Sequence, residues 1–271
     1  MVLGEAKLRY TQLGAFNDPF EGRPEITQVA TDEEALQALA DALQKEAAKV
    51  YETLPSEVKR TLPFSAMLNQ LQAHANTKQL ELLQQYKSLT GIAKSLLHQK
   101  VDEYIGSLCL SEVPDSLLMW SHYSASHSGF VIEFDTHHEY FNGKRSDNDE
   151  FRHLRRVLYR ETRPSMPLSK LESPDLFLVK SGHWSYEREW RILRALTEAS
   201  TVIPASPFPV HLFPFPRHTV LSVILGARVT DATESAIRAA LAAHPEYKEV
   251  QLRRALPDPT HFLLRIVEDA N

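Results

Sequence analysis

The sequence has very little cysteine and no long hydrophobic segment. Among its 271 residues Cys109 is the only cysteine, so no intramolecular disulfide can form, and no Cys/His spacing typical of a zinc site surrounds it. The beginning of the sequence lacks the apolar core of a signal peptide, and no stretch approaches the roughly 18 continuous apolar residues of a membrane-spanning helix. We therefore expect a cytoplasmic protein that does not enter a membrane.

The sequence also lacks a large excess of either charge. Thirty Lys and Arg residues against 35 Asp and Glu residues give a formal net charge of -5, so a nucleic-acid partner is possible but is not supported by charge. Hydrophobic residues at 43% and charged residues at 24% are typical of a folded protein and argue against disorder. The Gly-rich signatures of Rossmann and P-loop nucleotide sites are missing, as is the Gly-x-Ser-x-Gly elbow of α/β hydrolases.

A block of helices is predicted near the N-terminus. Thr31 and Glu34 have the spacing of a capping box, and apolar residues then recur at helical spacing. Shorter helical periods continue to about residue 104. We expect residues 31–104 to form a helical insertion or lid within a single domain of residues 1–271.

The remaining sequence is predicted to be mainly β. Short apolar or alternating runs bounded by turn residues predict strands at 7–11, 106–111, 129–135, 156–159, 187–196, 219–226, 248–255 and 261–267. Helices are predicted at 115–123, 175–181 and 231–244, the last with Asp231 and Glu234 at capping-box spacing, and the proline-rich run 204–216 is predicted to be an extended connection. Because strands and helices do not alternate regularly, we predict an α+β fold with an antiparallel or mixed sheet.

The first cluster that could carry chemistry is the turn Phe16-Asn17-Asp18-Pro19-Phe20-Glu21. Asn17 and Asp18 before a proline favour a fixed turn, because their side chains can bond to nearby backbone, and Glu21 adds a second carboxylate. A purely structural turn held by the two phenylalanines is the alternative.

The second cluster is a predicted short helix that carries Trp120, His122 and Tyr123 and leads through a polar loop into the strand at 129–135. Aromatic faces and histidines gathered at a strand entrance suit the stacking of a planar ligand ring. The alternative is an aromatic core patch with solvent-exposed histidines. The neighbouring His137-His138-Glu139 is not predicted to bind a metal, because consecutive residues of an extended chain do not converge on one ion.

The third cluster runs from Lys180 to Ile192 and contains Tyr186. In a strand, Glu187, Glu189 and Arg191 would point to one face. Two carboxylates on one face raise each other's pKa unless a cation lies between them, and such pairs serve as general bases or stabilise positive charge. Arg191 could equally neutralise both carboxylates, so a structural Glu/Arg ion-pair ladder is the alternative.

These three clusters, in this order, resemble a bacterial protein family called domain of unknown function 2971. The family pattern is Phe-Asn-Asp-Pro-Phe-Glu near the start, Trp-Ser-His-Tyr leading through Gly into Val-Ile-Glu-Phe-Asp, and Lys followed by Trp-x-Tyr-Glu-x-Glu-Trp-Arg. The sequence carries them at 16–21, 120–135 and 180–191. Family members begin with a strand containing Lys and Tyr and then a helix before the segment equivalent to 7–11, where this sequence departs from the pattern.

The layout of this family resembles that of the ADP-ribosyltransferase superfamily, in which a split mixed sheet binds NAD. The resemblance implies a mostly antiparallel split sheet, NAD as a small-molecule substrate, and an enzyme used in bacterial defence. It makes Glu189 the catalytic acid and Glu187 the residue that orients the acceptor. It also implies that Trp120, His122 and Tyr123 shape the nicotinamide or ribose pocket. The cofactor-binding residues that we predict in full are Trp120, His122, Tyr123, Asn17, Asp18, Tyr186 and Arg191.

Two other functions are compatible with the sequence. Asp18, Glu21, Glu187 and Glu189 could hold Mg²⁺ or Mn²⁺ in a phosphodiesterase or nuclease, with Lys180 stabilising a phosphate. That hypothesis requires the four carboxylates to converge in space. Alternatively, the motifs are structural, the protein is a non-catalytic binding module, and its helical block docks a partner.

Overall fold

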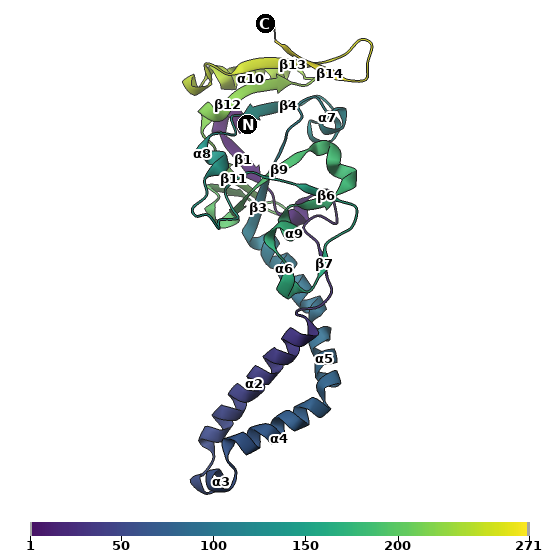
Figure 1. Cartoon of the computed structure of the whole chain (residues 1–271). Coiled ribbons are helices and arrows are strands. Elements are labelled where there is room, and N and C mark those ends of the chain that lie inside the picture. The colour runs from purple at the N-terminus through teal and green to yellow at the C-terminus, as the bar shows by residue number, and fades with distance from the viewer. Residues whose placement is uncertain (1, 270–271) are drawn as a thin grey trace. The chain divides into compact units, whose positions relative to one another are not determined.

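The computed structural model describes residues 2–269 (Figure 1). Its packing divides the chain into two compact units. Unit 1 consists of Met1–Arg23, Gln99–Arg163 and Ser173–Asn271, and unit 2 consists of Pro24–His98 and Pro164–Glu172. The prediction of a single domain with a helical insertion or lid stays a prediction.

Unit 2 is mainly helical, as the sequence predicted. Its helices are α2 (Asp32–Thr53), α3 (Ser56–Thr61), α4 (Phe64–Thr77), α5 (Gln79–Ser88) and the first part of α6 (Thr90–Tyr104), and its two short strands are β2 (Glu25–Ile26) and β7 (Ser165–Met166). The predicted capping box is confirmed. The Thr31 hydroxyl accepts the Glu34 N–H, and the Glu34 carboxylate accepts the Thr31 N–H at 2.9 Å, so two backbone donors at the start of α2 are satisfied.

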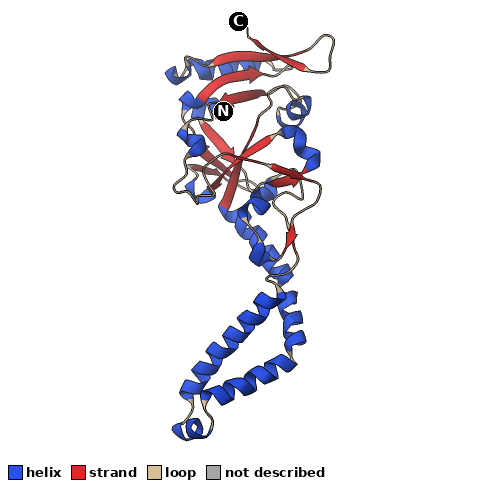
Figure 2. Ribbon diagram, viewed as in Figure 1, coloured by secondary structure: helices blue, strands red, loops and turns tan. Residues whose placement is uncertain are grey.

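Unit 1 contains several small sheets, drawn in red in Figure 2. One has the order β1-β11-β10, from β1 (Lys7–Tyr10), β11 (Val210–Pro214) and β10 (Thr201–Ile203). A second has the order β14-β13-β12-β4, from β14 (Leu264–Glu268), β13 (Gln251–Pro257), β12 (Val220–Leu225) and β4 (Phe130–Phe134). The third has the order β3-β9-β5, from β3 (Ile105–Ser111), β9 (Glu189–Ala195) and β5 (Arg155–Arg156), and β6 (Leu158–Arg160) pairs with β8 (Val179–Ser181).

Most of these strand pairs are antiparallel, and the exceptions are β12 with β13, β2 with β7 and β6 with β8. The α-helices of unit 1 outside α6 are α1 (Val2–Glu5), α7 (Leu117–Tyr123), α8 (Glu139–Asn142), α9 (Ser173–Phe177) and α10 (Asp231–Ala242). The α+β class predicted from the sequence is therefore confirmed. No helix within residues 2–269 is long and apolar enough to cross a membrane.

The cores of unit 1 hold the strands that carry the candidate site. Ile237 on α10 packs against Val223 and Leu225 of β12 in one core, and all three are fully buried. A second core places Tyr10 and Ile192 together, which joins β1 to β9. Burying a side chain of this size stabilises the fold by roughly 1.5–3 kcal/mol. These contacts fix β9, which begins at the candidate site.

The structure corrects several predicted boundaries. The predicted helix at 175–181 ends at Phe177, and its last residues form β8 instead. Residues 204–216 are more than a connection, because β11 lies within them and pairs with β1 and β10. The helix α10 is capped by Thr230, whose hydroxyl accepts the Thr233 N–H, rather than by Asp231.

The strand predicted at 187–196 begins two residues later. Gly182–Glu187 form a 3₁₀ helix, η3, and Arg188 has a φ of +44°, so the backbone turns before β9 begins at Glu189. We predicted that Glu187 lies in one strand with Glu189 and Arg191, but Glu187 belongs to η3 and only the other two lie in β9. The expected single-strand arrangement is wrong, although both carboxylates still face the same space.

Candidate functional site

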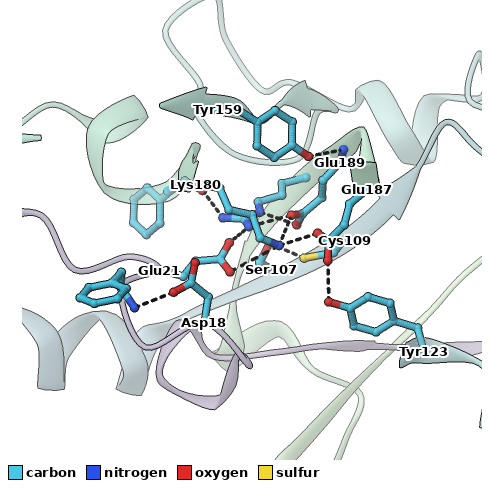
Figure 3. A network of polar contacts seen from close by, with 12 residues as sticks. Asp18, Glu21, Ser107, Cys109, Tyr123, Tyr159, Lys180, Glu187 and Glu189 are labelled. Atoms are coloured by element: carbon cyan, nitrogen blue, oxygen red, sulfur yellow. Dashed lines mark hydrogen bonds and ion pairs between the residues drawn. The ribbon is translucent and has the colours of Figure 1, made fainter. Parts of the chain in front are cut away.

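A cavity of about 460 Å³ lies in unit 1, and we call it the carboxylate cavity. Three separate parts of the chain form it: β1 with the turn that follows it, β3 with α7, and the segment from β8 to β9. Its ionisable and aromatic lining includes Asp18, Glu21, Tyr123, Lys180, Glu187 and Glu189. Figure 3 shows these side chains directed toward one another.

Lys180, on β8, lies at the centre of this cluster. Its Nζ donates to Glu187 Oε2 at 2.5 Å and to Glu189 Oε2 at 2.8 Å, and lies 3.5 Å from Glu21 Oε2. The Lys180 side chain is only 6% exposed, so these contacts are shielded from water. Burial lowers the pKa of the Lys180 ammonium. The negative charges of Glu189 and Glu187 outweigh that effect and hold this pKa above its usual value, so Lys180 is charged at neutral pH.

Arg191 lies behind the wall of the cavity and is fully buried. Its guanidinium contacts Glu189 through Nε at 2.6 Å and Nη2 at 3.0 Å, pairs with Glu21, and donates from Nη1 to the Phe177 carbonyl at 2.6 Å. Burial lowers its pKa to about 9, against the opposing effect of Asp18, so the group stays protonated at neutral pH. The bidentate contact holds the Glu189 carboxylate in one orientation.

The two glutamates have different surroundings. Burial raises the pKa of Glu189, and the positive charge of Lys180 opposes the rise. Glu187 is held by Lys180 and by Tyr123, whose hydroxyl donates to Glu187 Oε1 at 2.6 Å. Burial and this contact raise the pKa of the Tyr123 phenol, so it stays a donor at neutral pH.

The turn after β1 supplies the remaining carboxylates. Asp18 Oδ1 accepts the Phe20 N–H at 2.9 Å, as expected for an Asp turn, whereas the buried Oδ2 has no hydrogen-bond partner among residues 2–269. Gly22 ends the turn at a φ of +63°, and a Cβ there would lie 2.5 Å from Leu13. The turn is therefore both structural and part of the cavity wall, and a chemical role for its carboxylates stays a prediction.

Cys109, on β3, is a lining residue for which the sequence indicated no site role. Its thiol is exposed to the cavity, and the sulfur lies 3.6 Å from Ser107 Oγ. The surrounding protein and the nearby Glu189 charge raise its pKa well above the usual value, so the thiol is protonated at neutral pH. The alternation of apolar and polar residues at 106–111 predicts a strand. It does not predict which side chain of that strand faces Glu187 and Glu189. Trp184 also lines the cavity, with its ring centroid 5.1 Å from Lys180 Nζ.

Several predicted ligand-binding residues lie elsewhere. Trp120 is buried in a hydrophobic core with Ile224 and does not line the carboxylate cavity, and His122 is exposed beside Tyr123. Tyr186 is half-buried with its ring 6.2 Å from Trp184, also outside the lining. Asn17, Asp18 and Tyr123 line the cavity, and Arg191 supports its wall from behind.

The cluster is not arranged as a metal centre. Within the described residues, no group of three or more His, Cys, Asp or Glu side chains is placed to hold a metal ion. Asp18, Glu21, Glu187 and Glu189 do face one cavity, as the metal hypothesis requires. However, Lys180 and Arg191 form ion pairs at close range with three of them, Glu21, Glu187 and Glu189.

Comparison with known proteins supports the resemblance to one family. Residues 119–192 match the model of a protein family of unknown function, DUF2971. The matched segment runs from α7 to β9 and includes Tyr123, Lys180 and both cavity glutamates of this region. No curated protein and no solved structure matches the chain.

Proposed function

We propose that the chain is an ADP-ribosyltransferase-like enzyme that uses NAD as a substrate, in bacterial defence. The observation that carries this proposal is the pair Glu187 and Glu189, whose carboxylates are held in fixed orientations on the wall of one cavity. Such orientation is what charge stabilisation in a transition state requires. The match of residues 119–192 to the family model is consistent with the proposal but does not indicate an activity, because the function of that family is unknown.

The reaction would break the bond between the ribose anomeric carbon and the nicotinamide nitrogen. The bonding electrons pass to the ring nitrogen, so nicotinamide leaves as a neutral molecule and positive charge develops on the ribose. An acceptor nucleophile then bonds to the anomeric carbon and loses a proton. The carboxylate of Glu189 would stabilise the developing positive charge and anchor a ribose hydroxyl, and Glu187 would orient the acceptor.

The surroundings suit these two roles. Lys180 and Arg191 hold Glu189 from two sides, so little reorganisation is needed when charge develops. The Tyr123 hydroxyl fixes the second carboxylate, and Trp184 offers an aromatic face in the same cavity. In this proposal Trp184 takes the ring-stacking role that the sequence had suggested for Trp120.

Two alternatives remain as proposals. A divalent-metal phosphodiesterase or nuclease is favoured by the four carboxylates around one cavity, but Lys180 and Arg191 already form ion pairs with three of those carboxylates. A non-catalytic binding module is favoured by the Glu189–Arg191 contact, which is the structural ion pair that the sequence offered as an alternative. The experiment below separates the three.

The single cysteine provides a direct test of ligand binding. Because Cys109 lines the carboxylate cavity, NAD bound there should slow alkylation of its thiol by iodoacetamide, followed as the mass shift of the intact protein. NAD at a hundredfold above its Kd should also stabilise the folded protein by about 2.7 kcal/mol. Nicotinamide release is assayed on the same samples, with Glu189→Gln and Glu187→Gln as variants and circular dichroism as the check of folding.

Protection of Cys109 with glutamate-dependent nicotinamide release would support the transferase proposal. Absence of protection, stabilisation and release would refute it. In that case, stabilisation by Mg²⁺ or Mn²⁺ with chelator-sensitive cleavage of a phosphodiester would favour the metal alternative. A protein that responds to neither NAD nor metal would favour the binding module.

A further inference from the structure

A second cavity, of about 450 Å³, lies beside the first in unit 1, and we call it the strand cavity. Both cavities are lined by Cys109, Leu110, Ser111, Met119 and Tyr123. The two spaces are therefore neighbours along the last three residues of β3. A ligand in the strand cavity would lie next to Tyr123, which holds Glu187.

The strand cavity follows an unpaired sheet edge. All five residues of β4 (Phe130–Phe134) line it, and β4 is the edge strand of the sheet β14-β13-β12-β4 (Figure 1). Within residues 2–269, β4 pairs only with β12. The opposite side of β4 thus carries backbone donors and acceptors that no neighbouring strand uses.

The hydrogen bonds at the two ends of β4 identify these free groups. The Gly129 carbonyl accepts from Gly226, and the Asp135 N–H donates to Thr219, so both residues direct their backbone toward the β12 side. In an antiparallel ladder, the direction alternates from one residue to the next. Phe130, Ile132 and Phe134 therefore direct their N–H and C=O groups outward, away from β12.

We propose that the strand cavity binds an extended polypeptide segment, which adds to β4 as a further antiparallel or parallel strand. The three outward-facing residues span four residue steps, so they form a ladder of about 13 Å at roughly 3.3 Å per residue. A small ligand does not need such a ladder, whereas a peptide main chain matches its donors and acceptors directly. The charged side chains that line the cavity are Glu112, Glu133 and Arg253, and Glu133 lies 3.6 Å from Arg253, so one of the two carboxylates has a nearby counter-charge among the lining residues.

The role of the segment rests on the proposed function. If the carboxylate cavity transfers ADP-ribose, the neighbouring peptide would supply the acceptor side chain, and the substrate class would be protein. The binding of peptide to β4 does not itself require NAD. The two proposals can therefore fail separately.

The test uses a matched pair of proline variants in the full chain. Ile132→Pro removes an outward N–H from β4 without removing a bond to β12, which is the position where an edge strand tolerates proline. Ile266→Pro is the control on β14, the other edge of the same sheet. The Asp269 N–H donates to Leu252 on β13, so alternation directs the Ile266 backbone outward as well. Both isoleucines are half-buried.

The probe is a library of immobilised 12-residue peptides of random sequence. Wild type and Ile266→Pro should bind the same peptides, and Ile132→Pro should bind them at least tenfold more weakly. Methylation of alternate backbone nitrogens in a bound peptide should cause a similar loss, and this arm does not depend on the folding of any variant. Binding unchanged by both Ile132→Pro and peptide N-methylation, or no peptide bound, would overturn the proposal.

Nicotinamide release from NAD, measured without peptide, separates the two proposals. Peptide binding at β4, with no nicotinamide release, no protection of Cys109 by NAD and no stabilisation by NAD, would refute the proposed function and leave the peptide site standing. Nicotinamide release that is equal in wild type and Ile132→Pro, with no peptide binding, would refute the peptide site alone.

Discussion

Replacing Arg191 should destabilise the protein strongly, because this guanidinium is the counter-charge for two buried carboxylates. In Arg191→Met, Glu189 loses contacts at 2.6 and 3.0 Å, Glu21 loses its ion pair, and the Phe177 carbonyl loses a donor at 2.6 Å. Removing one partner of a buried ion pair costs about 3–5 kcal/mol. At roughly 2–4 °C per kcal/mol for a protein near this size, the Tm should fall by about 6–20 °C.

The matched control is Arg253→Met. Arg253 is 30% exposed and lies 3.6 Å from the half-exposed Glu133, so its loss should cost no more than about 1 kcal/mol. Both variants are compared with wild type by urea denaturation and by thermal unfolding. Arg191→Lys, which keeps the charge but not the bidentate contact, should fall between wild type and Arg191→Met.

The loss of stability in Arg191→Met, measured as the decrease in the free energy of unfolding relative to wild type, should also depend on pH. Burial already raises the pKa of Glu189, and losing the guanidinium raises it further. The folded state then binds more protons than the unfolded state between the ordinary glutamate pKa and the raised value, so stability falls as pH rises through that window. The deficit should thus be smaller near pH 5 than near pH 8. A deficit no larger than that of Arg253→Met, or one independent of pH, would refute this account of the cluster.

Three further results are expected. Tyr123→Phe should lower the free energy of unfolding in urea by about 1 kcal/mol, because the 2.6 Å bond to Glu187 is lost from a half-exposed side chain, and an unchanged midpoint would contradict that bond. Glu189→Gln should lower the pKa of Cys109 and speed its alkylation at pH 8, whereas an unchanged pH profile of the alkylation rate would show that the carboxylate does not act on the thiol. Thr31→Ala should cost about 1 kcal/mol and speed amide hydrogen exchange in α2 but not in α10, so equal effects in both helices would contradict a local capping role.

Much of the fold could be predicted because its signals are local. The capping box at Thr31 and Glu34, the strand at 106–111 and the last two strands depend on residues that are close in sequence. Predictions failed where a neighbouring segment decides the outcome. Val210–Pro214 has the composition of a connection, yet it forms β11 because β1 and β10 lie on either side and satisfy its backbone groups.

The positive φ of Arg188 is a similar case. Period-two alternation predicts that Glu187 and Glu189 lie on one face of a strand. In the structure, Arg188 has a left-handed conformation and separates η3, which ends at Glu187, from β9, which begins at Glu189. Both carboxylates nevertheless reach the same cavity, because Lys180 lies between them. For these two glutamates, the sequence pattern predicted that the carboxylates face one space, but it did not predict the backbone conformation that places them there.

The sequence by itself determined the α+β class, the helical block and the residue types of the candidate site. Only the tertiary structure decided which of those residues meet. Lys180 reaches the cluster because β8 pairs with β6, and Cys109 joins it because β3 pairs with Glu189–Ala195 across the third sheet. The sequence around Trp120 suggested a residue that stacks on a ligand, but its side chain is buried because it packs against Ile224 and Ala255 in a hydrophobic core. Local patterns specify secondary structure and polarity, whereas contacts between distant segments depend on strand register and packing, which no short sequence window contains.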